Sequence, residues 1–142
     1  MVDEYGYELI GFYPVLGGMV NALAVSTRII IPVQTEFLAL KGLDRILKII
    51  DLMKNAHTKL FSYTIILTMF DRLAKTSVSI LIKLNEIYQD KVLAGVIPID
   101  INFRNASIVQ KLPSNFSGST RGVQAYRELL KYLMRVSREI EQ

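Results

Sequence analysis

Four short apolar runs, separated by longer stretches of helical period, constrain the fold of this chain more than any other feature. Apolar runs of this length are typical of buried strands, and their alternation with helices predicts βα units in a parallel sheet. Helices on both faces of such a sheet account for a composition that is 51% hydrophobic. We therefore expect an α/β fold with a mostly parallel sheet flanked by helices. The predicted strands are Tyr7–Phe12, Ile29–Val33, Tyr63–Met69 and Val92–Pro98.

Apolar side chains at three- and four-residue steps predict three helices, over Phe37–Lys54, Ser77–Tyr88 and Ser119–Ile140. The stretch Lys111–Thr120 contains Pro113 and Gly118 and is predicted to be a loop. In a chain of 142 residues without a repeat or a long linker we expect a single domain covering residues 1–142. The last helix is expected to bury Tyr126, Leu129, Leu130 and Leu133.

Several classes of protein are disfavoured by composition. No apolar run reaches the roughly 20 residues that a membrane-spanning helix needs. The acidic start does not have the pattern of a signal peptide, so we expect a cytoplasmic protein. With no cysteine and one histidine, no metal site is predicted. A net charge of +4 tolerates an anionic partner without demanding one.

Ligands of parallel α/β folds bind at the carboxyl ends of the strands, so the segments that follow the predicted strands are informative. Read in order, these segments resemble the C-terminal part of ParA/MinD-type partitioning ATPases over nearly the whole chain. The resemblance implies a partial P-loop NTPase fold. It rests on Pro32-Val33-Gln34-Thr35-Glu36, Leu67-Thr68-Met69-Phe70-Asp71, Val96-Ile97-Pro98-Ile99-Asp100 and Arg121-Gly122-Val123-Gln124-Ala125-Tyr126.

Two departures from the family pattern bear on activity. The sequence contains no G-x-x-x-x-G-K-[ST] string, which in the family holds the phosphates and the metal ion. At the end of the first predicted strand, Gly11 stands where the family has an aspartate of the metal site. We therefore expect an N-terminally truncated domain with no ATPase activity of its own and no cofactor when alone. ATP and Mg²⁺ are implied only by the resemblance.

The resemblance also places the strand that leads into the phosphate loop between the first two predicted strands. Its absence would leave a gap of about 4.8 Å, one strand spacing, with unpaired backbone groups on both sides. Half of a nucleotide site is implied to remain beside the adenine. Its residues would be Thr68, Met69, Asp71, Pro98, Asp100 and Phe103. Alternatively, the carboxylates of Asp71 and Asp100 have structural roles, in a turn and as a helix cap.

Arg127, Lys131, Arg135 and Arg138 are spaced by four, four and three residues and form one stripe on the last predicted helix. Such a stripe is either an ordinary solvated face or, as the family's nonspecific DNA binding implies, a surface that contacts phosphates.

The resemblance favours a plasmid or chromosome partitioning protein that acts through DNA or protein contacts, in the cytoplasm or on the nucleoid. The implied partners are a ParA-type ATPase, a centromere-binding protein, DNA or a second copy in a homodimer. One alternative is the second half of a split ATPase, completed by a separately encoded segment. Another is a truncated gene product with no retained role.

Overall fold

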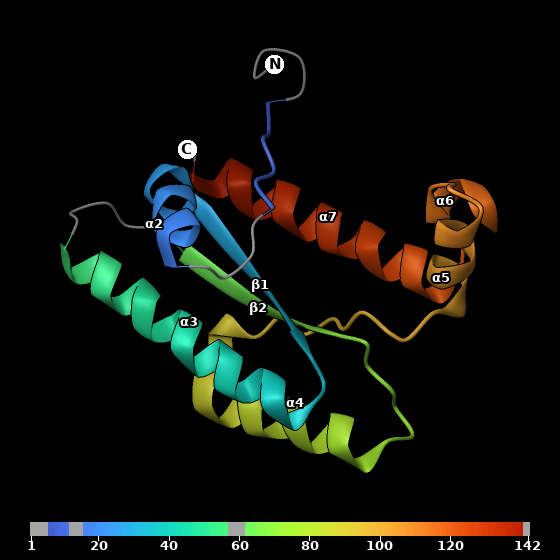
Figure 1. Cartoon of the computed structure of the whole chain (residues 1–142), viewed down its shortest axis with the longest axis horizontal. Coiled ribbons are helices and arrows are strands. Elements are labelled where there is room, and N and C mark those ends of the chain that lie inside the picture. The colour runs from blue at the N-terminus through green and yellow to red at the C-terminus, as the bar shows by residue number, and fades with distance from the viewer. Residues whose placement is uncertain (1–5, 12–15, 57–61, 141–142) are drawn as a thin grey trace.

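The computed structural model describes residues 6–11, 16–56 and 62–140. Two parallel strands lie among helices, so the predicted α/β class is confirmed (Figure 1). The elements are α2 (Leu16–Val25), β1 (Arg28–Gln34), α3 (Phe37–Ala56), β2 (Ser62–Thr68), α4 (Lys75–Tyr88), the 3-10 turn η1 (Gln89–Lys91), α5 (Ile101–Ile108), α6 (Pro113–Phe116) and α7 (Arg121–Ile140).

The sheet pairs β1 with β2 from Arg28 opposite Ser62 to Gln34 opposite Thr68. The Thr35 N–H donates to the Thr68 carbonyl at 3.3 Å, so the odd-numbered residues of β1 direct their backbone groups toward β2. Pro32 therefore faces the opposite edge, where its missing N–H removes a donor. A proline there is typical of an edge strand.

The fourth predicted strand, Val92–Pro98, is wrong as a strand but right in its position. One isolated bridge joins Val92 to Ile65 of β2, and another joins Pro98 to Phe70, two residues beyond the end of β2. The Leu93 N–H donates to the Ile65 carbonyl and the Ile97 N–H donates to the Leu67 carbonyl. The four-residue step from Leu93 to Ile97 thus spans the same distance as the two-residue step from Ile65 to Leu67. Because the segment has two residues more than β2 over this distance, it cannot form a regular ladder of hydrogen bonds.

The first predicted strand is also wrong for the residues that the structure describes. Residues 6–11 form no strand and are exposed, and Phe12 lies outside the described residues. Leu9 exposes 87% of its surface. Ile10 and Gly11 line an apolar cleft beside β1 but do not pair with that strand.

One core lies between the strands and the helices α2, α3 and α4. Ile29, Ile31 and Val33 of β1 belong to it, together with Ile65 and Leu67 of β2. The intervening residues Thr64 and Ile66 are also buried, on the other face of β2, so this strand is covered on both faces. In Figure 1, α3 and α4 lie on one side of the strands and α7 lies on the other.

The remaining differences concern helices. α2 and α5 were not predicted, and α6 adds one turn within the stretch predicted as a loop. α7 buries less than expected, because Tyr126 and Leu130 expose 47% and 55% of their surfaces. Leu129 and Leu133 are half-buried. Within the described residues, no helix combines the length and the apolar character needed to cross a bilayer.

Candidate functional site

A cleft of about 440 Å³ opens where β1 and β2 end and α4 begins. Its position at the carboxyl ends of parallel strands is the one where α/β folds bind ligands. The lining residues are Gln34, Thr35, Glu36, Phe37, Met69, Asp71, Ala74, Thr76, Ser77 and Ile99.

A chain of hydrogen bonds shapes the floor of this cleft. The Ser77 hydroxyl donates to Thr35 Oγ1 at 2.9 Å, and the Thr35 hydroxyl donates to the Met69 carbonyl at 3.0 Å. Thr35 and Ser77 are both buried. Buried hydroxyls are stable only when they are hydrogen-bonded, so this network joins the end of β1 to the first turn of α4.

Met69 is held in a left-handed conformation with φ of 52°. This region costs a residue with a Cβ roughly 1–2 kcal/mol. The side chain is 52% exposed, and it contributes to the rim of the cleft. The hydrogen bond from Thr35 to the Met69 carbonyl helps to fix this turn.

Asp71 and Pro98 lie close to the same turn. Asp71 Oδ1 accepts from the Leu73 N–H at 2.9 Å, which makes Asp71 a turn residue. Pro98 bridges to Phe70, next to Met69. Thr68, Met69, Asp71 and Pro98 therefore lie at one end of the sheet, where Met69 and Asp71 line the cleft and Thr68 and Pro98 do not. Their place beside an adenine stays a prediction.

Asp100 caps α5 and also holds the start of α7. Its Oδ1 accepts from the backbone N–H of Asn102 at 3.0 Å, and its Oδ2 accepts from the N–H of Gly122 at 2.9 Å. The hydroxyl of Thr120, and then these backbone groups, lower the pKa of Asp100 from 3.8 to about 2 against the opposing effect of burial. The helix-cap role left open by the sequence is the one that the structure shows.

Phe103 packs toward α7 as well. Its ring meets that of Tyr126 edge to face, with centroids 5.6 Å apart. A Cβ on Gly122 would collide with Phe103 Cε2. Asp100 and Phe103 thus belong to the α5–α7 junction, and neither lines the cleft.

Sequence reasoning missed Thr35 and Ser77. Thr35 lies between a predicted strand and a predicted helix, and Ser77 begins a predicted helix. At such positions capping is the default interpretation of a hydroxyl. The hydrogen bond between two residues 42 positions apart has no local signal in the sequence.

The four basic residues predicted as a stripe lie on α7 and are all exposed. Lys131 forms an ion pair with Glu128 at 2.7 Å, and the Arg135 guanidinium lies 5.9 Å from the centre of the Tyr132 ring. Both contacts are at the surface, where ion pairs contribute little and leave the cations accessible.

Comparison with known proteins agrees with this architecture. Residues 1–63 match the family model of an AAA domain. The chain is 32% identical over 131 residues to the sporulation initiation inhibitor protein Soj of Bacillus subtilis, covering 91% of this chain and 52% of that protein. It is 29% identical over 137 residues to the chromosome partitioning protein ParA of Myxococcus xanthus, covering 95% of this chain and 48% of that protein.

The chain is similar to Soj and ParA partitioning proteins over nearly its whole length. A third relative, the chromosome-partitioning ATPase Soj of Treponema pallidum, is 27% identical over 134 residues, covering 93% of this chain and 53% of that protein. This ParA-like chain spans about half the length of the curated relatives it matches.

The strand-end cleft of the ParA-like chain does not suit the triphosphate of ATP. Two carboxylates, Glu36 and Asp71, line it, and among the described residues no lysine or arginine does so. Phosphate oxygens need cationic side chains or a cradle of N–H groups. The described residues around this cleft therefore do not form a phosphate site.

Proposed function

We propose that this ParA-like chain takes part in chromosome or plasmid partitioning by contacting DNA through α7, without ATP hydrolysis of its own. The observation that carries the proposal is the exposed basic stripe of Arg127, Lys131, Arg135 and Arg138. The sequence similarity to Soj and ParA proteins supports a role in partitioning. A centromere-binding protein or a full-length ParA-type ATPase is the corresponding protein partner.

The geometry of α7 suits a flat contact with a phosphate backbone. At 100° per residue, the four basic residues fall on one side of the helix. Half-buried Leu129 and Leu133 fall on the other side and anchor α7 to the fold. A helix held in this way presents its cations without having to order them on binding.

DNA affinity measured across a salt series tests the proposal. Fluorescence anisotropy with a labelled 20-base-pair duplex should give a dissociation constant that rises steeply with salt. Replacing the four stripe residues by alanine should weaken binding at least tenfold and lower the salt slope by roughly one unit for each lost phosphate contact.

A matched control removes the same charge from other surfaces. Arg72, Lys75, Arg104 and Lys111 are exposed and lie outside α7. Their joint replacement by alanine should leave the salt slope near that of the original chain. Equal losses in both variants would point to net charge alone and would refute a site on α7.

A second candidate is the complemented ATPase, favoured by the open edge of β1. A cleft of about 410 Å³ beside this edge is lined almost wholly by apolar side chains, among them Ile10, Met19, Leu23 and Ile30. A strand from a separately encoded segment would cover them. Copurification with a polypeptide that carries a Gly-Lys phosphate loop, followed by saturable binding of a fluorescent ATP analogue, would support it. No complex and no nucleotide binding would eliminate it.

A further inference from the structure

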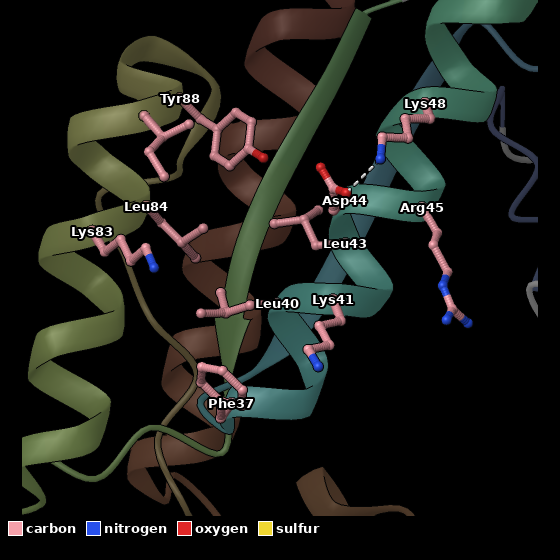
Figure 2. A pocket seen from close by; sticks show the side chains of 11 residues that line it. Phe37, Leu40, Lys41, Leu43, Asp44, Arg45, Lys48, Lys83, Leu84 and Tyr88 are labelled. Atoms are coloured by element: carbon pink, nitrogen blue, oxygen red, sulfur yellow. Dashed lines mark ion pairs between the residues drawn. The ribbon is translucent and has the colours of Figure 1, made fainter.

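A second groove, remote from the strand ends, lies between α3 and α4 and has a volume of about 470 Å³ (Figure 2). Its floor is apolar. Leu40 and Leu43 project from α3, and Leu84 projects toward them from α4. Leu43 and Leu84 are 2% and 1% exposed, so the floor belongs to the core and is fixed in shape.

The apolar character of the groove extends to its rim. Phe37 and Ile87 line it and expose 66% and 56% of their surfaces. Exposed apolar side chains that adjoin a shaped apolar groove are typical of an interaction surface, whereas isolated ones are not. Tyr88 is half-buried in the same wall. Its burial, and to a smaller extent the negative charge of Asp44, raise the pKa of its hydroxyl.

The charges around the groove are predominantly positive. Four basic side chains and one acidic side chain line it, a net charge of +3. The acidic residue, Asp44, already forms an ion pair with Lys48, with Nζ and Oδ2 2.9 Å apart. Lys41, Arg45 and Lys83 form no ion pair within the described part of the chain. Lys41 and Lys83 come from opposite helices and so flank the floor on both sides.

We propose that this groove binds an acidic amphipathic helix of a partner protein. Apolar residues on one face of that helix would cover the leucine floor, and flanking Glu or Asp residues would pair with Lys41 and Lys83. The lining residues on α3 run from Phe37 to Lys48, about 16 Å at 1.5 Å per residue, which matches roughly three turns of a docked helix. The proposal is independent of DNA binding by α7.

The apolar floor distinguishes this partner from a nucleic acid. Phosphate backbones pair with Lys and Arg but would leave the exposed apolar rim of Phe37 and Ile87 uncovered. An acidic amphipathic helix complements both the apolar floor and the basic rim of the groove. Its apolar face would supply affinity, and its charges would fix its orientation.

Fluorescence anisotropy with the intact chain and a labelled 14-residue helical peptide tests the proposal. The peptide carries leucine at positions 2, 6, 9 and 13 and glutamate on both flanks of that stripe. We expect saturable binding at least tenfold tighter than that of the same peptide with lysine in place of glutamate. Equal binding of the two peptides, or no binding of either, would overturn the proposal.

Charge reversal locates the contact. The double variant Lys41→Glu and Lys83→Glu should weaken binding of the acidic peptide at least tenfold, while Lys111→Glu with Arg104→Glu, exposed elsewhere, should change it less than twofold. Because all four side chains are exposed, both variants should keep the circular dichroism spectrum of the original chain. If the groove variant loses binding of a DNA duplex but not of the peptide, the groove is a nucleic-acid contact and the proposal fails.

Discussion

The N–H of Gly122 donates a hydrogen bond to Asp100 Oδ2 at 2.9 Å and thereby ties the start of α7 to the cap of α5. A Cβ at residue 122 would lie 2.9 Å from the Asp100 Cβ. The position of α7, and with it the basic stripe, therefore depends on one close approach between two short segments.

Replacing Gly122 by alanine should lower the free energy of unfolding by about 1–3 kcal/mol, because the added methyl group overpacks the junction with Asp100 and Phe103. Urea denaturation measures the change. The matched control is Gly42→Ala, at an exposed position of α3 where an added Cβ meets nothing within 4 Å. That variant should gain about 0.5–1 kcal/mol. A neutral Gly122→Ala variant would mean that α7 docks differently.

The low pKa of Asp100 predicts a specific response to acid. A carboxyl whose pKa falls from 3.8 to about 2 on folding stabilises the native state fully above its unfolded pKa, and this contribution disappears as the pH falls toward 2. Urea denaturation at several pH values should show a wild-type chain that loses more stability between pH 4 and pH 2 than Asp100→Asn does. Parallel curves for the two proteins would contradict the assignment.

The hydroxyl pair under the strand-end cleft should be stabilising. Thr35→Val leaves the Met69 carbonyl and the Ser77 hydroxyl without their partner and should cost about 1–3 kcal/mol in unfolding free energy. Combined with Ser77→Ala in a double-mutant cycle, it should show a coupling energy clearly above zero. Thr76→Ala, at an exposed neighbouring position, serves as the control and should change stability by less than about 0.5 kcal/mol.

The left-handed backbone of Met69 predicts an unusual tolerance for glycine. Met69→Gly should leave stability unchanged or raise it by up to about 1 kcal/mol, since the half-exposed side chain contributes little packing and glycine adopts φ of 52° without strain. Met69→Val should be destabilising, because a β-branched side chain suits this region poorly. Thermal denaturation of both variants gives the comparison, and a loss of more than 1 kcal/mol in Met69→Gly would show that the side chain is needed.

Local periodicity was sufficient for the elements that carry their own pattern. α3 and α4 were predicted close to their observed bounds, because apolar residues at helical spacing mark the side that packs on a sheet. β1 and β2 were predicted from their runs of branched apolar residues. The ParA-like similarity was visible in the segments that follow them.

Failures occurred where an element depends on what lies beside it. Val92–Pro98 has the composition of a strand, yet its extra residues against β2 prevent a continuous ladder. The apolar run at residues 7–11 has no partner in the described chain. Pairing is a property of two segments, and no single segment encodes it.

The sequence by itself determined the positions of β1, β2, α3 and α4 and the basic stripe of α7, because each follows from residue periods within one segment. The alternation of these segments predicted the α/β class. Only the tertiary structure decided that Asp100 and Phe103 serve the α5–α7 junction, that Thr35 and Ser77 meet, and that α3 and α4 enclose a basic apolar groove. These features join residues far apart in the chain. Their energies come from close packing and buried hydrogen bonds, which exist only once the elements have docked.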